Sequence, residues 1–249
     1  MFQHTLARVS RTHLQDLYNE PLSPPTSSLS WTGIPLIHDE VFTGLYRLGH
    51  FTSSSLIATD PDISVHAKLL TGGLLPLCTT LASESIFNAF LSEEKSDALL
   101  HGHSYTAHAV GCEVARYSVD AMRDMDAGET WKPFKRDWTG SNSSVSSAGG
   151  LWCMWSHDFV ATLSKHASVD SVFALGSVLA VSLRDDKGGG YTSTAAVGLR
   201  DQLIKVKEAE GDLIHSRVLG NVLYLMASMT STKESLSSVE EVVKKALGV

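Results

Sequence analysis

Short apolar runs bounded by turn residues alternate with amphipathic stretches along most of the chain. In the first half, three runs predict short buried strands: residues 34–37, 62–66 and 76–82. Two amphipathic stretches predict helices: one that begins after a cap at Ser83, and one from about Thr106 to Met125. Alternating strands and helices predict an α/β fold with layered packing.

The second half continues this alternation. Predicted helices cover residues 155–166, 194–210 and 235–247, and predicted strands cover residues 171–174, 178–183 and 217–226. Ser237 and Glu240 have the spacing of a capping box at the start of the last helix. Between the halves, residues 128–150 are rich in glycine and serine, which favours a linker or surface insertion. We therefore predict one domain over residues 1–127 and a second over residues 151–249.

The amino-terminal stretch allows two interpretations. Residues 1–14 carry two arginines and no acid, as a mitochondrial transit peptide does. Apolar residues at helical spacing favour a surface helix instead. A loop rich in proline and serine follows at residues 21–30.

Composition narrows the classes of function. A net charge of -7 and a pI near 5.8 argue against nucleic acid as the partner. No apolar run approaches the roughly 18 residues that a membrane span needs. The cysteines form no CxxC pair, so neither a disulfide framework nor a zinc ribbon is predicted. His101, His103 and His108 have no acid or cysteine at ligand spacing, which disfavours a metal site.

An acid and a lysine follow two of the predicted strands. Asp39 lies just after the strand at 34–37, and Lys68 lies just beyond the strand at 62–66. Ligands of open α/β sheets bind at the carboxyl ends of strands. A carboxylate can keep a pyridine nitrogen protonated, and a partly buried lysine can carry a cofactor as an imine and then transfer protons. The pair therefore predicts a pyridoxal phosphate site.

Two further features have weaker signals of their own. The segment 101–106 precedes the long helix, whose amides could bind a phosphate, although such a segment is equally typical of a capping loop. Arg217 stands beside a predicted strand, where its planar fork could clamp a carboxylate or form a surface salt bridge.

Four blocks, at residues 39–49, 67–83, 101–115 and 217–226, resemble the class III aminotransferases. Within that class they are most similar to the adenosylmethionine–8-amino-7-oxononanoate aminotransferases of biotin synthesis. The resemblance implies the carboxyl-terminal part of a fold-type I pyridoxal phosphate enzyme: an incomplete large-domain sheet and a small carboxyl-terminal domain. It also implies a homodimer with active sites at the subunit interface.

The same resemblance implies roles for individual residues. Asp39 would pair with the pyridine nitrogen, Val41 would pack on the ring, and Lys68 would carry the cofactor. Gly102 would lie near the substrate, and Ser104, with His103 beside it, would reach the phosphate of the neighbouring subunit's cofactor. Arg217 would bind the substrate carboxylate. The chain departs from the family at His38, where an apolar residue is common, and it shows neither the family's Gly-Ser phosphate loop nor its ring-stacking aromatic residue.

The implied reaction transfers an amino group from S-adenosylmethionine to 8-amino-7-oxononanoate and gives 7,8-diaminononanoate. Two alternatives stay open: another class III ω-aminotransferase, or a catalytically inactive fragment. The fungal and plant members, some fused to dethiobiotin synthetase, imply a location in the mitochondrial matrix or the cytoplasm. The chain itself carries no P-loop for the synthetase activity.

Overall fold

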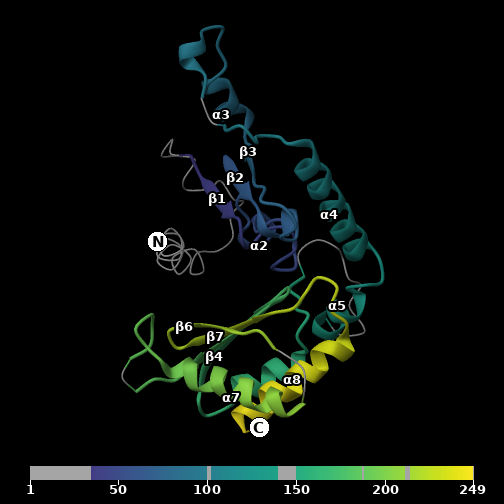
Figure 1. Cartoon of the computed structure of the whole chain (residues 1–249), viewed down its shortest axis with the longest axis vertical. Helices are drawn as coiled ribbons and strands as arrows, with labels where there is room; N and C mark the ends of the chain where they lie inside the picture. Colours follow the sequence, from purple (N-terminus) through teal and green to yellow (C-terminus); the bar gives the residue numbers. More distant parts are fainter. Residues whose placement is uncertain (1–34, 100–101, 140–149, 187, 211–213, 249) are drawn as a thin grey trace, which may run out of the picture.

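A computed structural model describes residues 35–99, 102–139, 150–186, 188–210 and 214–248. The predicted amino-terminal helix and the loop at 21–30 lie outside these residues. Figure 1 shows an upper part with a small sheet and a projecting arm, and a lower part in which helices line one side of a larger sheet. Strands and helices thus form packed layers, and the predicted α/β class is confirmed.

The upper part is built on a three-stranded sheet in the order β1-β2-β3. Strands β1 (Ile37–Glu40) and β2 (Ile63–His66) are parallel, and β3 (Thr79–Ala82) is antiparallel to β2. The strand predicted at 34–37 thus lies further along the chain and begins at Ile37. Its buried positions are the polar residues His38 and Glu40, and their neighbours are exposed, so the alternation of buried and exposed positions is not an alternation of apolar and polar residues.

Short helical elements and one long helix complete the upper part: α2 (Ser54–Ile57), η1 (Lys68–Leu70), α3 (Glu84–Ala89), η2 (Lys95–Asp97) and α4 (Ala109–Ala127). Ser83 precedes α3 as predicted, but its side chain makes no capping bond. Phe87, expected on the apolar side of α3, is 62% exposed on the projecting arm that contains this helix (Figure 1). Helix α4 begins later than predicted because Ala107 has a φ of 54°, outside the helical region. The side chain of His108 caps it by accepting from the amide of Gly111.

The lower part contains an antiparallel sheet in the order β4-β5-β7-β6. Its elements are α5 (Lys132–Thr139), α6 (His157–Ser164), β4 (Val169–Leu175), β5 (Val178–Leu183), α7 (Ala195–Glu210), β6 (Arg217–Leu219), β7 (Val222–Met226) and α8 (Lys233–Leu247). The single run predicted at 217–226 is thus a hairpin that turns at Gly220, where φ is 62° and the backbone of Gly190 leaves no room for a side chain.

Two local predictions are corrected. Helix α8 is capped by Thr232 in a box with Ser235, not by Ser237, because Glu240 is buried and bonded elsewhere. Helix α5 occupies part of the segment for which a linker or insertion was expected. Trp131, just before it, is 0% exposed, so this stretch belongs to the core. The division into domains around this segment stays a prediction.

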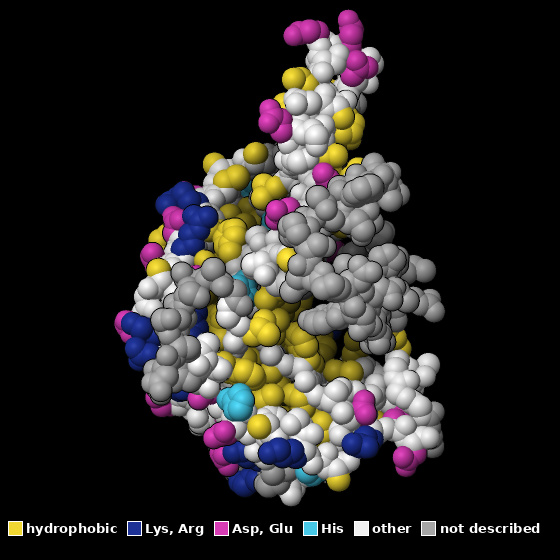
Figure 2. All heavy atoms as spheres, turned by 180° about the vertical axis from the view of Figure 1, so that it is seen from behind, with side chains coloured by type: hydrophobic (Ala, Val, Ile, Leu, Met, Phe, Trp, Pro, Cys, Tyr) yellow, Lys and Arg dark blue, Asp and Glu magenta, His cyan; other side chains and the backbone are white. Residues whose placement is uncertain are grey.

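Aromatic side chains fill the core where the two parts meet. The rings of Trp131 and Trp152 lie 5.7 Å apart, and the ring of Tyr46, from the upper part, lies 5.2 Å from Trp131. Hydrophobic side chains also gather across the middle of the rear face (Figure 2). Within the ranges that the structure describes, no helix is long and apolar enough to span a membrane.

Candidate active site

The two parallel strands of the upper sheet bring Asp39 and Lys68 to the same region. In the register of β1 and β2, Asp39 pairs with Val65 and Glu40 with His66. Lys68 follows shortly after the end of β2, in the first position of η1. Neighbouring strands lie about 4.8 Å apart. The acid and the amine therefore stand at adjacent carboxyl ends of parallel strands, the edge at which α/β sheets bind ligands.

Asp39 is exposed on the sheet face opposite to His38 and Glu40. Its Oδ1 accepts a hydrogen bond of 3.1 Å from the amide of Val41, which is half-buried. This contact holds one carboxylate oxygen against the local backbone, and a carboxylate has a second oxygen that can accept from a partner.

The backbone around Lys68 is unusual. Its φ is 55°, in the left-handed region that costs a side-chain-bearing residue free energy and that often occurs at functional sites. The next two residues hold the segment: Leu70 is buried in the core, and the carbonyl of Leu69 accepts 2.8 Å from the hydroxyl of Ser118 on α4. Lys68 itself is exposed. A fixed backbone thus presents a free amine side chain.

Three polar side chains, His38, Glu40 and His66, are buried on the other face of β1 and β2. Burial lowers the pKa of His38 below its ordinary value, while the charges of Glu40 and Asp60 oppose this shift. The Nδ1 of His38 lies 3.4 Å from the hydroxyl of Ser54. These groups back the strand end that carries Asp39.

The turn after β1 is joined to the lower part by hydrogen bonds to its backbone carbonyls. The carbonyl of Arg47 accepts from the amide of Ser177 at 2.9 Å and from its hydroxyl at 3.2 Å. The indole of Trp152 donates to the carbonyl of Gly49 at 2.9 Å. Gly176 lies so close to Gly49 that a Cβ on it would overlap the backbone of this turn. We call these contacts of Arg47, Gly49, Trp152, Gly176 and Ser177 the joint.

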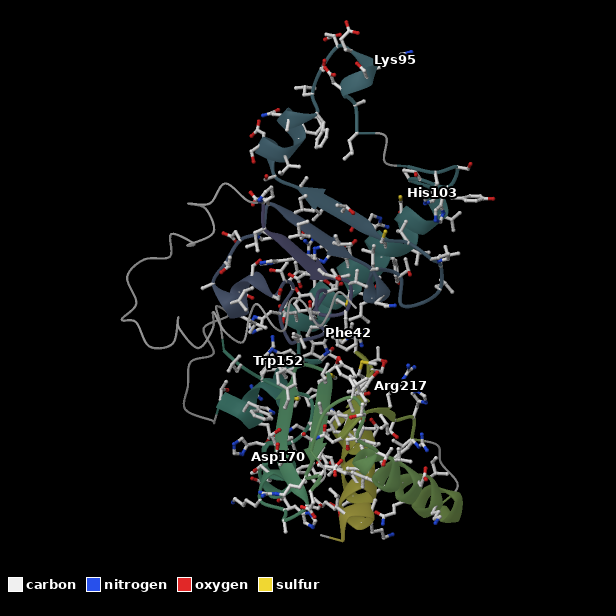
Figure 3. The ribbon with its side chains drawn as sticks, turned by 90° about the vertical axis from the view of Figure 1, so that its left-hand side faces the viewer. Phe42, Lys95, His103, Trp152, Asp170 and Arg217 are labelled. Carbon is white, nitrogen blue, oxygen red and sulfur yellow. The ribbon has the colours of Figure 1, made fainter. Side chains whose placement is uncertain are left out.

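Arg217 is the first residue of the edge strand β6 and is exposed. It pairs with Tyr224, which pairs with Ala180, which in turn pairs with Phe173. Side chains at directly paired positions share a face. Leu223 and Leu225 are buried on the helix-covered face, so the row with Arg217 occupies the face that points toward the upper part (Figures 1 and 3).

The segment predicted to bind the cofactor phosphate lies just before α4. Gly102, His103 and Ser104 are exposed in a turn before α4, in which Thr106 Oγ1 accepts from the amide of His103 at 2.8 Å. Because α4 begins at Ala109, these residues precede its first turn instead of forming it. Figure 3 shows His103 far from Phe42, the residue three positions after Asp39. Within one chain, His103 therefore lies apart from the turn that follows Asp39.

The chemistry of the pair fits a pyridoxal phosphate ring. An exposed carboxylate and an exposed amine at adjacent strand ends can hold opposite sides of one planar cofactor. The described residues contain no group of three or more side chains that could hold a metal ion. Sequence reasoning did not identify Glu40, Gly176 or Ser177. The bond from Ser53 to Glu40 spans 13 positions, and the contacts of Gly176 and Ser177 with the turn span many more; the only local signal was the position of Glu40 beside Asp39.

Comparisons with known proteins agree with this chemistry. The family model "Aminotransferase class-III" matches residues 30–136. The bifunctional dethiobiotin synthetase/adenosylmethionine-8-amino-7-oxononanoate aminotransferase of Emericella nidulans is 54% identical over 99% of this chain and 31% of its own length. The mitochondrial bifunctional dethiobiotin synthetase/7,8-diamino-pelargonic acid aminotransferase of Arabidopsis thaliana is 38% identical over 86% of this chain and 24% of its own length.

Solved structures extend the agreement to the fold. The adenosylmethionine-8-amino-7-oxononanoate aminotransferase of Methanocaldococcus jannaschii superposes with a TM-score of 0.67 at 24% identity, over 88% of this chain and 46% of that one. The chain thus spans a third or less of the curated bifunctional relatives and about half of the solved enzyme. By sequence, residues 30–136 carry a class III aminotransferase domain, from a family of pyridoxal phosphate enzymes, and the chain shares its fold with the solved enzymes.

Proposed function

We propose that this chain supplies the lysine side of the pyridoxal phosphate site of an aminotransferase in biotin synthesis. The observation that carries the proposal is the parallel register of β1 and β2, which puts Asp39 and Lys68 at neighbouring strand ends. The parent reaction is amino transfer from S-adenosylmethionine to 8-amino-7-oxononanoate, as the names of the relatives indicate.

When bound, the cofactor supplies an electron sink for the substrate's amino carbon. Asp39 holds a positive charge at the pyridine nitrogen by pairing with it. Val41, half-buried after the strand end, offers an apolar surface to the ring. Lys68 would hold the cofactor through its Nζ and, once the substrate's amino group has displaced that nitrogen, would move a proton as base and acid.

Arg217 has a separate task in this proposal. Its guanidinium, on the sheet face that points toward the upper part, binds the substrate carboxylate through two parallel hydrogen bonds. The joint holds this sheet against the turn that follows Asp39. The distance between the carboxylate end and the reacting end of the substrate is therefore fixed by the fold.

The outward position of Gly102, His103 and Ser104 supports a dimer in this proposal. These residues are exposed, and His103 lies apart from Phe42 in the turn after Asp39, so Ser104 would serve the cofactor phosphate of a partner subunit, with Gly102 near its substrate. The relatives also lead us to propose a mitochondrial location, since the plant proteins are named mitochondrial, and association with dethiobiotin synthetase activity.

Covalent labelling tests the proposal. The purified chain is mixed with pyridoxal phosphate, the absorbance band near ~400 nm is recorded, and borohydride reduction followed by peptide mass spectrometry locates the label. We expect the band and a label on Lys68, both lost in Lys68→Ala and kept in Lys95→Ala, which removes another exposed lysine. Label elsewhere in folded protein, or a band that persists in Lys68→Ala, contradicts the assignment.

The amino donor is tested on the same preparation once it is loaded. Conversion of 8-amino-7-oxononanoate with S-adenosylmethionine is compared with conversion by an ω-amino acid donor. Turnover with the ω-amino acid alone would assign the chain to the other class III ω-aminotransferases. Failure of the folded chain to bind the cofactor would support the inactive fragment.

A further inference from the structure

The Glu40 carboxylate is the buried anchor of the turn that follows Asp39. Its side chain is 2% exposed. Both of its oxygens accept from the amide of Ser53, at 2.8 and 3.0 Å, and the hydroxyl of Thr43 lies 3.4 Å from Oε2. Its backbone carbonyl accepts from the amide of Gly44 at 3.1 Å. One residue thus holds the start and the end of the turn over residues 41–53.

Backbone hydrogen bonds and close packing also hold the turn over residues 41–53. Within it, the amide of Leu45 donates to Phe51 at 2.8 Å, and that of Tyr46 donates to His50 at 2.9 Å. Beneath it, the ring of His66 lies so close to Gly44 that any side chain there would overlap Nδ1. His66 also pairs in register with Glu40. The carboxylate of Glu40 is therefore enclosed by the turn that it ties.

Alternation along β1 connects this anchor to Asp39. Successive side chains of a strand point to opposite faces, so fixing Glu40 on the buried face fixes Asp39 on the exposed face. The bond from the amide of Val41 to Asp39 Oδ1 stays within the same short stretch. This bond fixes the orientation of the Asp39 side chain relative to the local backbone. The bonds of Glu40 fix the position of that backbone relative to the sheet.

We propose that Glu40 is a positioning residue that aims the Asp39 carboxylate at the pyridine nitrogen through the bond to Ser53. The role of Asp39 rests on the proposed function. The link from Glu40 to the geometry of Asp39 is independent of the proposed function, because it depends only on hydrogen bonds within the chain.

The first experiment needs no cofactor. Amide hydrogen exchange at Ser53 and Val41 is measured in the unaltered chain, in Glu40→Gln, Glu40→Ala and in the control Glu84→Ala, an exposed acid of the upper part. We expect exchange at both amides to rise by about tenfold in Glu40→Ala. The rise should be smaller in Glu40→Gln, which keeps one acceptor, and absent in the control. Circular dichroism checks that each variant folds. If Glu40→Ala does not fold, the exchange rates in Glu40→Gln decide the positioning role.

The second experiment uses the cofactor as a spectroscopic probe. The affinity for pyridoxal phosphate and the pH dependence of its bound absorbance are compared in the same four proteins. We expect Glu40→Gln to bind several-fold more weakly and to shift the pH profile, because a misaimed Asp39 holds the ring nitrogen's proton less well. The control should match the unaltered chain.

The outcomes separate the two proposals. If the unaltered chain takes up no cofactor, the proposed function fails, and exchange at Val41 alone decides the positioning role. Faster exchange at Ser53 with unchanged exchange at Val41 overturns that role, since Glu40 would then hold the turn without affecting Asp39. Unchanged affinity and pH profile in Glu40→Gln, in a chain that does bind cofactor, overturn it as well.

Discussion

At the residue scale, the small upper sheet separates two kinds of polar side chain. Asp39 and Lys68 are exposed at the edge where a ligand would bind, whereas His38, Glu40 and His66 are buried behind it. A buried polar group is costly unless it is bonded, so the buried set must be explained by its contacts. For Glu40 these are the bonds to Ser53, and for His38 the contact with Ser54.

The buried His38 predicts a dependence of stability on pH. Desolvation lowers its folded-state pKa, so below pH 6.5 the unfolded chain binds a proton that the folded chain resists. Stability should therefore fall as the pH drops through and below 6.5, and recover as it rises. Urea unfolding at pH 7.5 and 5.5 measures this change, which should be smaller in His38→Gln.

His50 provides the comparison for this test. Burial lowers its pKa as well, so His50→Gln should also reduce the change, and the double variant should reduce it further. An equal loss of stability on acidification in the unaltered chain and in His38→Gln would contradict the assignment to His38.

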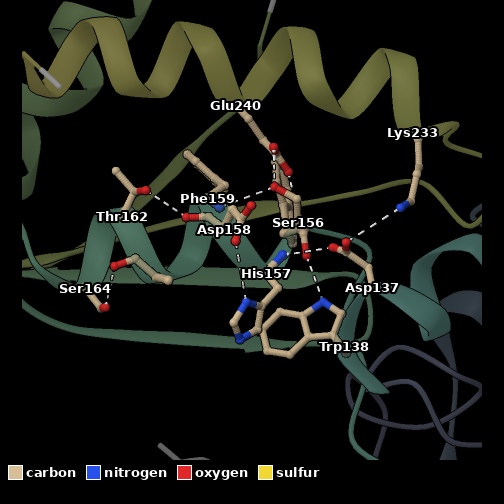
Figure 4. A network of polar contacts seen from close by, with 12 residues as sticks. Asp137, Trp138, Ser156, His157, Asp158, Phe159, Thr162, Ser164, Lys233 and Glu240 are labelled. Atoms are coloured by element: carbon tan, nitrogen blue, oxygen red, sulfur yellow. Dashed lines mark hydrogen bonds and ion pairs between the residues drawn. The ribbon is translucent and has the colours of Figure 1, made fainter. Parts of the chain in front are cut away.

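At the element scale, helices α5, α6 and α8 are tied by polar contacts around Ser156, the N-cap of α6 (Figure 4). The buried carboxylate of Glu240 on α8 accepts from the amide and the hydroxyl of Ser156, both at 2.7 Å. Asp137 on α5 accepts from the amide of His157 at 2.9 Å and lies 3.8 Å from Lys233. Side chains from two helices thus satisfy the amino-terminal amides of a third.

Replacing Glu240 tests this network. Glu240→Ala leaves the groups on Ser156 without their buried acceptor, so we expect a loss of about 2–3 kcal/mol in the free energy of unfolding. The matched control is Glu241→Ala on the same helix, whose exposed carboxylate pairs with Lys244 at 2.8 Å. That pair should contribute less than about 0.5 kcal/mol. Equal effects of the two substitutions in urea unfolding would refute the network's role.

At the scale of the whole molecule, the joint connects the candidate cofactor edge to the sheet that carries Arg217. It consists of backbone atoms, the hydroxyl of Ser177 and the indole of Trp152, and it includes an approach at Gly176 that leaves no room for a side chain. Such contacts favour one relative placement of the two parts, because interlocked backbones have few alternative arrangements.

A methyl group at Gly176 should disrupt this placement. Gly176→Ala adds a Cβ against Gly49 at a φ of 56°, so we expect at least about 3 kcal/mol of destabilisation. Gly198→Ala is the control, since its Cβ meets nothing within 4 Å on helix α7 and should stabilise by about 0.5–1 kcal/mol. In denaturant, unfolding followed by tryptophan fluorescence and by far-ultraviolet dichroism should show the same midpoint in the unaltered chain. In Gly176→Ala the two probes should show different midpoints. Coincident transitions with unchanged stability would exclude a coupling role for the joint.

The sequence by itself determined the class of fold, most element positions and the candidate chemistry. Local patterns suffice for these, because the apolar run in β5, the helical spacing in α8 and the blocks around Asp39 and Lys68 each depend on residues close in the chain. Element boundaries were less predictable. Strand β1 was displaced because its buried positions are polar, and the cap of α8 was misplaced because Glu240 is used by a distant helix.

Only the tertiary structure decided which residues support the site. The parallel register that puts Asp39 and Lys68 at neighbouring strand ends, the bond from Ser53 to Glu40 and the joint at Gly176 all connect positions far apart in the chain. The same holds for α5, where a stretch that looked like a linker contributes Trp131 to the core. Such contacts arise when the chain buries its apolar surface and must pair most of the polar groups enclosed with it, a requirement that no local pattern records.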